Sequence, residues 1–373
     1  MDRYPNRVEI DCSALRHNLM QIRSLIPAET AVTAVVKADA YGHGMIDAAR
    51  TLEAAGAERL AVAHLAEALR LRKAGLRCPV VVLCGILTRA EAGAVVENDL
   101  IPVLPGPETA GILSDESRRR GKRTRVQLKI DTGMGRLGVP ATRAGAFVDE
   151  VLKRDGLEPE GLMSHLSSAD EADRGFTESQ IRAFGIALET ARSRGMDTRA
   201  SSLANSAGTL GYPESHLGMI RPGILLYGGS PSPDLFLPVQ LEPAMTLKAT
   251  VLQLRDFPEG TPISYGRTYT TGGPERIAVI SAGYSDGLPR SLSNRGRVLI
   301  GGVRAPIRGR ICMNLTMADV SDRPEVRPGD EAVFLGRQGD AVLTGDELAG
   351  ACDTISYEIY CAVGRCGEKT TIP

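Results

Sequence analysis

The chain has neither a long apolar run nor a surplus of charge of one sign. No apolar stretch reaches the roughly 18 residues that a membrane-spanning helix needs. The 45 acidic residues nearly balance the 44 basic ones, so the net charge is −1. The charge balance gives no electrostatic reason to expect binding to nucleic acid or to a membrane surface. The N-terminal residues MDRYPNRVEIDC also lack the apolar core of a secretory signal, and we expect a cytoplasmic protein.

The cysteine pattern argues against two further classes of protein. The chain has seven cysteines but no CxxC pair, the spacing that is typical of structural zinc sites. A chain of 373 residues also buries a sizeable core without disulfides. We therefore expect no metal site and no disulfide framework. Reduced, buried thiols are expected at positions 12, 78, 84, 312, 352, 361 and 366.

The first two-thirds of the chain alternate between short β-rich runs and helical stretches. In segments such as 46–55 and 66–74, apolar residues recur every three or four positions, which is typical of helices. Strands separated by helices pair in parallel, and eight such runs predict a closed (β/α)₈ barrel of the TIM type. An open doubly wound sheet is the alternative, although no GxGxxG motif follows the first run. The runs are 32–39, 60–64, 80–85, 101–105, 126–132, 161–166, 199–205 and 217–221.

The pattern changes near residue 230. Residues 228–243, GGSPSPDLFLPVQLEP, are rich in Pro, Gly and Ser, as is typical of a linker. We predict an α/β chain with a barrel domain over 1–238 and a smaller, mostly-β domain over 239–373. The second domain is expected to hold one helix at 345–351 and strands at 245–254, 276–281, 297–300, 317–320 and 332–335.

Lys37 has an unusual position at the end of an apolar run, within AVVKADAYGHG. Burying an ammonium group is unfavourable, so a lysine seldom points into a dry barrel. At the carboxyl end of a barrel strand it would face the mouth of the barrel, where a partly desolvated lysine can attack a carbonyl group. A solvated lysine just past the strand fits this position equally well.

The motif AVVKADAYGHG resembles the pyridoxal 5′-phosphate site of the alanine racemase family, whose fold is called type III. In that family the lysine binds the cofactor covalently and the tyrosine four residues later contacts its phosphate. The resemblance therefore assigns these roles to Lys37 and Tyr41. It implies the interconversion of L-alanine and D-alanine by two bases acting on an external aldimine. The family's usual role is to supply D-alanine for peptidoglycan.

Other barrel residues match positions of the family that bind the cofactor or the substrate. In KIDTGMGRLG, Arg136 matches an arginine near the substrate carboxylate, a role that suits a planar guanidinium. Lys129 matches a lysine that is often carbamylated in the family. The resemblance places His165 against the cofactor ring. At the ends of the seventh and eighth runs, the matching cofactor-binding residues are Asn205, Ser206, Gly223 and Ile224.

Arg221 bears on the chemistry of the site. Many pyridoxal-phosphate enzymes place a carboxylate beside the pyridine nitrogen, which keeps that nitrogen protonated. The family places an arginine there instead, and Arg221 matches it. Because an arginine cannot accept that proton, the resemblance implies an unprotonated nitrogen. Delocalisation of the carbanion is then restrained, and side reactions such as transamination are suppressed.

The resemblance also assigns a second base, from the strand-rich domain. Racemisation removes a proton from one face of the α-carbon and delivers one to the other face, which two bases do directly. ISYGRTY matches the segment that carries this base, at Tyr265. Lys37 would take the proton of D-alanine and Tyr265 that of L-alanine. In the family, the tyrosine comes from the partner subunit of a head-to-tail homodimer, so the active sites are shared.

Three more matches concern the substrate pocket. Met313 matches a residue that reaches the partner's substrate pocket through its backbone N–H. Tyr357 matches a tyrosine that contacts the phosphate and leaves room for little more than a methyl group, which favours alanine. Asn314 stands where many relatives have aspartate.

Three other functions remain open. A broader amino-acid racemase is disfavoured by Tyr357. A pyridoxal-phosphate carrier resembles the barrel half alone and needs no second base such as Tyr265. A decarboxylase of similar shape usually presents a carboxylate to the ring nitrogen. Arg221 carries a guanidinium instead, which disfavours this alternative.

Overall fold

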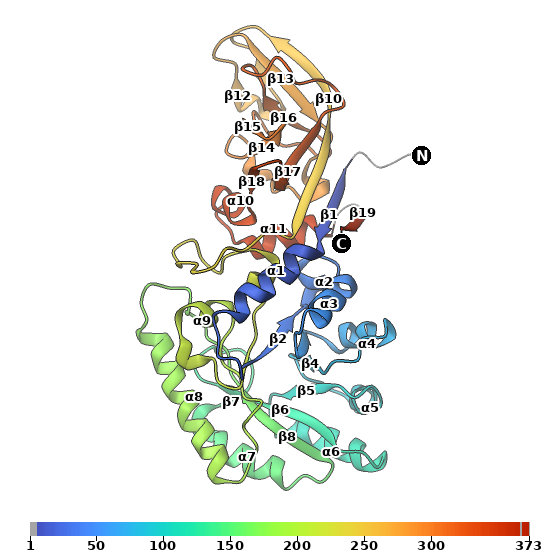
Figure 1. Cartoon of the computed structure of the whole chain (residues 1–373), viewed down its shortest axis with the longest axis vertical. Coiled ribbons are helices and arrows are strands. Elements are labelled where there is room, and N and C mark those ends of the chain that lie inside the picture. Colours follow the sequence, from blue (N-terminus) through green and yellow to red (C-terminus); the bar gives the residue numbers. More distant parts are fainter. Residues whose placement is uncertain (1–5, 366–367, 373) are drawn as a thin grey trace.

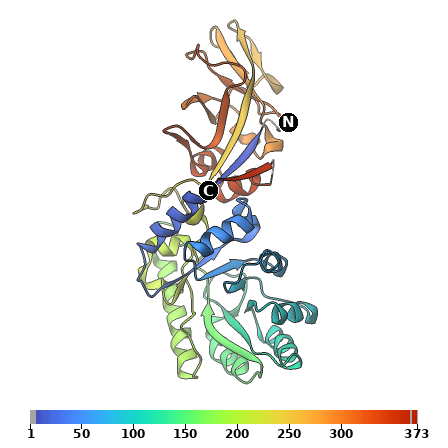
Figure 2. The same cartoon turned by 45° about the vertical axis from the view of Figure 1, so that its right-hand side comes forward.

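The computed structural model describes residues 6–365 and 368–372. A barrel with its helices forms one lobe, and a strand-rich part forms the other (Figures 1 and 2). Helix α11 (Ser356–Val363) lies between the lobes and packs against α2 (Lys37–Tyr41) of the barrel. The start of the barrel therefore meets the end of the chain.

The barrel consists of parallel strands that are buried almost throughout. Their hydrogen-bonded order runs β6-β5-β4-β3-β2-β9, and β8 pairs with the other side of β6. Runs of Val, Ile, Leu and Ala fit this double burial, because both faces of a barrel strand are covered. The strands are β2 (Ala31–Val35), β3 (Arg59–Val62), β4 (Val80–Val82), β5 (Ile101–Leu104), β6 (Thr124–Asp131), β8 (Leu157–Met163) and β9 (Met219–Ile220); the two-residue β7 (Val139–Pro140) also pairs with β6.

The ring closes through one residue. Ser202 forms parallel bridges with Met163 of β8 and with Met219 of β9 and so takes the eighth strand position. The predicted strand over 199–205 is therefore reduced to this bridge. One reason is that the Ser201 hydroxyl accepts the N–H of Leu162 at 2.9 Å, which replaces a ladder hydrogen bond. The predicted α/β class, with a (β/α)₈ barrel and a mostly-β second part, is confirmed.

Helices surround the barrel and begin at defined caps. The Asp11 carboxylate accepts the N–H groups of Ser13 and Ala14 at the start of α1. Thr88 and Glu91 form a reciprocal capping box at the start of α5. These helices are α1 (Cys12–Arg23), α3 (Met45–Ala54), α4 (Leu65–Lys73), α5 (Arg89–Glu97), α6 (Pro107–Arg119), α7 (Ala144–Leu152), α8 (Gly175–Ser193) and α9 (Ser206–Gly211).

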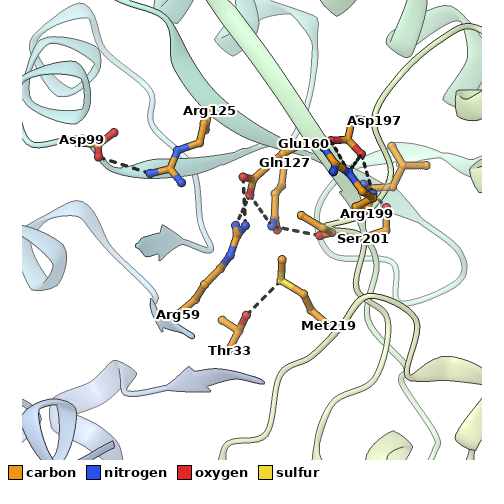
Figure 3. A network of polar contacts seen from close by, with 12 residues as sticks. Thr33, Arg59, Asp99, Arg125, Gln127, Glu160, Asp197, Arg199, Ser201 and Met219 are labelled. Atoms are coloured by element: carbon orange, nitrogen blue, oxygen red, sulfur yellow. Dashed lines mark hydrogen bonds and ion pairs between the residues drawn. The ribbon is translucent and has the colours of Figure 1, made fainter. Parts of the chain in front are cut away.

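The amino-terminal end of the barrel is closed by polar side chains (Figure 3). Arg59 of β3 and Glu160 of β8 form an ion pair there, with 15% and 12% of their side chains exposed. The Gln127 amide on β6 donates to the Glu160 carboxylate at 3.1 Å and to the Ala200 carbonyl at 3.3 Å. Functional groups at the opposite end therefore face a cavity that is closed below.

The strand-rich part is built around β10 (Met245–Phe257). One sheet runs β15-β14-β17-β10-β1-β19, and β13 pairs with the far half of β10. The remaining strands are β1 (Arg7–Asp11), β11 (Pro262–Ile263), β12 (Tyr269–Thr270), β13 (Glu275–Ile280), β14 (Arg297–Ile300), β15 (Val303–Pro306), β16 (Thr316–Asp319), β17 (Glu331–Gln338), β18 (Ala341–Leu343) and β19 (Glu368–Ile372), with helix α10 (Gly345–Cys352). Short 3₁₀ turns across both parts are η1 (Ala141–Arg143), η2 (Pro213–Ser215), η3 (Ile224–Tyr227), η4 (Tyr265–Arg267), η5 (Tyr284–Asp286) and η6 (Arg290–Leu292).

Strand β1 belongs to this second sheet although it lies near the start of the chain. It pairs antiparallel with β10 and parallel with β19, and α1 then leads into the barrel. The sequence pattern did not predict β1 or β19. The division into domains 1–238 and 239–373 stays a prediction.

The six cysteines of the described residues are free, but only Cys12 is buried. Cys84 is exposed, and the other four are partly exposed, so the expectation of buried thiols was wrong for five of them. These five lie on loops or helix faces at the edges of the core. Cys366 lies outside the described residues. Within residues 6–365 and 368–372, no helix is long and apolar enough to cross a bilayer.

Candidate active site

A cavity of about 370 Å³ opens at the carboxyl ends of the barrel strands. The structure brings eleven of the predicted site residues together in its wall. They come from the ends of β2, β6, β8 and β9 or the loops after them, from the segment after Ser202, and from α11. The eleven are Lys37, Tyr41, Lys129, Arg136, His165, Asn205, Ser206, Arg221, Gly223, Ile224 and Tyr357.

Lys37 stands at the start of a left-handed turn. Strand β2 ends at Val35, and the next residues turn so that Ala38 to Tyr41 all have φ between +53° and +56°. This conformation costs about 1–2 kcal/mol for each non-glycine residue, so the surroundings must stabilise it. Burial, followed by the Arg136 guanidinium, lowers the pKa of the Lys37 amine. A lowered pKa raises the fraction of neutral amine at a given pH, and only the neutral amine can act as a base or nucleophile.

Tyr41, Ser206 and Gly223 form a polar cradle on one side of the cavity. The Gly223 N–H donates to the Ser206 hydroxyl at 2.9 Å. A Cβ at Gly223 would lie 2.3 Å from the Tyr41 hydroxyl oxygen, so a side chain there would displace the tyrosine. Burial raises the pKa of Tyr41, which keeps its hydroxyl protonated and able to donate. Tyr357 packs beside it, with ring centroids 5.8 Å apart.

The Asn205 side chain shapes this side of the cavity by bonding to backbone groups. Its Oδ1 accepts the N–H of Gly208 at 2.9 Å, and its Nδ2 donates to the Leu166 carbonyl at 3.0 Å. The side chain thus caps α9 and ties it to the end of the β8 segment.

Arg221 and His165 form a buried pair on the opposite side. Arg221 donates to the Ser202 hydroxyl at 2.5 Å, to the Ser164 carbonyl at 2.6 Å and to His165 Nδ1 at 3.4 Å. Burial lowers the pKa of Arg221 to about 10, which leaves it charged at neutral pH. Burial and then the Arg221 charge lower the pKa of His165 well below its usual value. A neutral imidazole that accepts at Nδ1 carries its proton on Nε2.

Lys129 is buried beneath the loop that carries Arg136. Only 7% of Lys129 is exposed, and among the described residues its Nζ has no hydrogen-bond partner. Burial and then the Arg221 charge lower its pKa to about 7. A Cβ at Gly138 would lie 2.7 Å from the Lys129 Cγ, so the loop closes tightly over it. The Asp131 carboxylate stabilises this loop by accepting the N–H groups of Gly133 and Gly135 at 2.9 Å and 3.1 Å.

Tyr265 and Met313 do not reach this cavity. They lie on the strand-rich lobe with 69% and 56% of their surfaces exposed, and Tyr265 lines a separate groove of about 700 Å³. Ser264, with φ of +65°, holds the start of the Tyr265 turn by donating to the Arg310 carbonyl at 2.6 Å. The Asn314 amide donates to the Ser285 hydroxyl at 2.7 Å, a contact that an aspartate could make only as an acceptor.

The sequence analysis missed several residues of the cavity wall. Leu83 and Cys84 line it directly after β4, and Pro231 lines it from a loop. The position of Leu83 and Cys84 after an apolar run was a usable signal, because the carboxyl ends of barrel strands meet at one face. Pro231 lies in a loop, where no strand pattern marks it.

The fold and the cavity define a class of protein. A (β/α)₈ barrel with two amines, two guanidinium groups and an imidazole gathered at the carboxyl ends of its strands is a barrel enzyme, with its active site at the usual face.

Comparison with known proteins identifies the family. The model of the alanine racemase N-terminal domain matches residues 10–231, and that of the C-terminal domain matches residues 244–370. The alanine racemase of Syntrophobacter fumaroxidans is 46% identical over 358 residues, which are 96% of this chain and 95% of that protein. That of Halothermothrix orenii is 42% identical over 97% of this chain and 95% of its own length.

Solved structures agree with this match. Alanine racemase from the D-cycloserine producer Streptomyces lavendulae has a TM-score of 0.92 at 35% identity, covering 100% of this chain and 98% of that one. The enzyme from Bacillus anthracis with bound L-Ala-P has a TM-score of 0.88 at 34% identity, covering 100% and 96%. The chain belongs to the alanine racemase family, and the resemblance seen in its motifs is confirmed.

Proposed function

We propose that this protein is an alanine racemase that interconverts L-alanine and D-alanine with pyridoxal 5′-phosphate bound in the barrel cavity. The observation that carries the proposal is the placement of Lys37 in one cavity with the buried pair of Arg221 and His165. The Lys37 amine suits covalent attachment of the cofactor, and the Arg221 guanidinium suits a place beside the nitrogen of its ring. The supply of D-alanine for peptidoglycan and a cytoplasmic location are part of the same proposal.

The cavity suits the cofactor's phosphate. The hydroxyls of Tyr41 and Ser206 are hydrogen-bond donors, and the missing side chain at Gly223 lets the Tyr41 hydroxyl approach the backbone of Gly223. Hydroxyl and backbone N–H groups are the donors that phosphate sites use after the last strands of such barrels. We assign Asn205 to this group as the residue that caps the adjacent α9.

Arg221 sets the chemistry at the ring nitrogen. When bound, the cofactor attaches to the lysine amine and stabilises the charge left on the α-carbon after its proton is removed. Arg221 is charged and cannot take a proton, so it disfavours protonation of a nearby nitrogen. His165 is oriented by its bond to Arg221.

Two bases serve the two faces of the α-carbon in this proposal. Lys37, whose pKa is lowered by burial, takes the proton of D-alanine. Tyr265 of a second copy of the chain takes the proton of L-alanine, and the Met313 backbone of that copy reaches the same site. Their exposure on the strand-rich lobe supports a homodimer with shared sites.

The remaining residues bind and select the substrate. The Arg136 guanidinium suits the substrate carboxylate. Lys129 is suited to carbamylation, because a buried amine with a pKa of about 7 is already about half neutral at pH 7. The Tyr357 ring, packed beside Tyr41, limits the room for a side chain to little more than a methyl group.

The test is proton NMR of L-alanine in D₂O with the cofactor-loaded protein, together with chiral analysis of the product. Loss of the α-proton signal with growth of D-alanine is the expected result. Tyr265→Phe should slow exchange of the α-proton of L-alanine by about 10²-fold or more, and it should slow exchange of the α-proton of D-alanine less. If the wild-type protein shows no exchange and forms no D-alanine, the proposal is contradicted.

A further inference from the structure

The left-handed turn after Lys37 is held from outside by one carboxylate. Glu67 lies on α4, which follows the neighbouring strand β3. Its Oε1 accepts the N–H of Ala38, the residue after Lys37, at 2.7 Å. Its Oε2 accepts the N–H groups of Ala63 and His64 at 2.8 Å and 3.0 Å. One side chain thus joins the turn to the end of the adjacent strand.

This connection differs from the other anchors of the turn. Asp39 accepts the N–H of Met45 at 3.0 Å and pairs with Lys369, so it fastens the far end of the turn. The hydrogen bonds from Ala40 to Val36 and from Gly42 to Ala38 are internal to the turn. Glu67 alone among the described side chains bonds to the backbone of Ala38. The residue that follows Lys37 is therefore positioned from β3.

We propose that Glu67 is a positioning residue for Lys37: it keeps the strained turn in the one conformation that presents the Lys37 amine to the cavity. The inference rests on the proposed function, because it assumes that the position of this amine matters for proton transfer. Without Glu67, the Ala38 N–H loses its charged partner, and the turn can relax toward ordinary conformations that move Lys37.

The next βα unit contains a matched control. Glu91 stands at the same place on α5, and its Oε2 accepts the N–H groups of Leu87 and Thr88 at 2.7 Å and 2.9 Å. Among the described residues, it makes no hydrogen bond to the loop of a neighbouring strand. Glu91→Gln therefore removes a charge at a helix start, whereas Glu67→Gln also leaves one oxygen for the N–H groups that two oxygens accept in the wild type. The difference between the two variants isolates the bond to the turn.

The first measurement is amide hydrogen exchange of peptides covering residues 37–44 in the cofactor-loaded protein. Loss of a hydrogen bond to a charged group predicts exchange at least about tenfold faster in Glu67→Gln, and no such change in Glu91→Gln. Equal exchange in the two variants would overturn the proposal. If Glu67→Gln fails to fold, Glu67→Asp is used instead, because the shorter aspartate side chain cannot reach both Ala38 and the end of β3. Exchange at the wild-type rate in Glu67→Asp would also overturn the proposal.

The second measurement is the primary deuterium isotope effect on racemisation in each direction. A displaced Lys37 makes proton removal from D-alanine more rate-limiting, so the isotope effect with D-alanine should rise more than that with L-alanine. Equal effects in both directions would indicate a purely structural role and contradict the proposal. A wild-type protein that does not racemise alanine would refute the proposed function instead, and the exchange comparison would still test Glu67.

Discussion

Burial sets the protonation states of the side chains around the cavity. Desolvation disfavours the charged form of a lysine or histidine, and it lowers the pKa of Lys37, Lys129 and His165. The pKa of Arg221 also falls, to about 10, yet the guanidinium stays charged at neutral pH. The cavity thus combines two lysines and a histidine of lowered pKa with a guanidinium that stays charged. In the proposed function, this combination suits proton transfer beside a ring nitrogen that stays unprotonated.

The state of Lys129 is a prediction at the residue scale. Carbon dioxide reacts with a neutral amine, and the pKa of about 7 means that the neutral fraction grows as the pH rises through 7. We expect ¹³C-carbamate on Lys129 at pH 8 and much less at pH 6, under a constant pressure of ¹³CO₂, as seen by ¹³C NMR. Lys129→Ala should lack the signal. A wild-type spectrum without it at pH 8 would contradict the prediction.

Arg221 provides a second prediction at this scale. Replacing it by glutamate puts a carboxylate beside the ring nitrogen, which favours protonation and wider delocalisation of charge. We expect the ratio of pyruvate formed to alanine racemised to rise at least about tenfold in Arg221→Glu, measured by a coupled pyruvate assay. Arg221→Lys keeps the positive charge and should leave the ratio near that of the wild type. An unchanged ratio in Arg221→Glu would disprove this interpretation.

At the scale of elements, the two ends of the barrel have separate tasks. The carboxyl end carries the cavity, and the amino-terminal end is closed by Arg59, Glu160 and Gln127 from three strands (Figure 3). Stability and chemistry can therefore be altered independently.

The ion pair of Arg59 and Glu160 should show this separation. Glu160→Leu leaves the Arg59 charge without its partner in a largely buried place, at a cost of about 3–5 kcal/mol in the free energy of unfolding. The double variant Arg59→Met/Glu160→Leu should recover most of that loss. Urea unfolding of the apoprotein measures both effects.

A surface pair serves as the control. The side chains of Arg192 and Glu189 are 54% and 72% exposed, and breaking such a pair changes stability by about 1 kcal/mol or less. If Glu160→Leu is no more destabilising than Glu189→Ala, the ion pair does not stabilise the barrel.

At the scale of the whole molecule, both ends of the chain belong to one sheet. Strands β1 and β19 pair with each other beside β10, and Thr371 of β19 donates to Asp47 of α3 at 2.9 Å. The strand-rich lobe is thereby tied to the barrel at the helix next to the Lys37 turn. The same lobe presents Tyr265 to the outside.

Mixing two inactive variants tests the shared site. Lys37→Ala and Tyr265→Phe should each be inactive as homodimers. If Tyr265 serves the partner's cavity, the heterodimer has one complete site, and a random mixture should recover about a quarter of the wild-type racemase activity, because half of the dimers are mixed and each has one of two sites. No recovery after confirmed subunit exchange would place Tyr265 at the cavity of its own chain.

The sequence by itself determined the barrel, because runs of buried aliphatic residues alternate with amphipathic helices, and each pattern reports local structure. Its motifs also named eleven residues that the structure gathers in one cavity. Only the tertiary structure decided the rest. Four consecutive non-glycine residues in a left-handed turn, the closure through Ser202 and the pairing of β1 with β19 depend on contacts between distant segments. The same is true of the lowered pKa of Lys129 and of the bond from Ala38 to Glu67, since burial and strain arise only when the chain is packed.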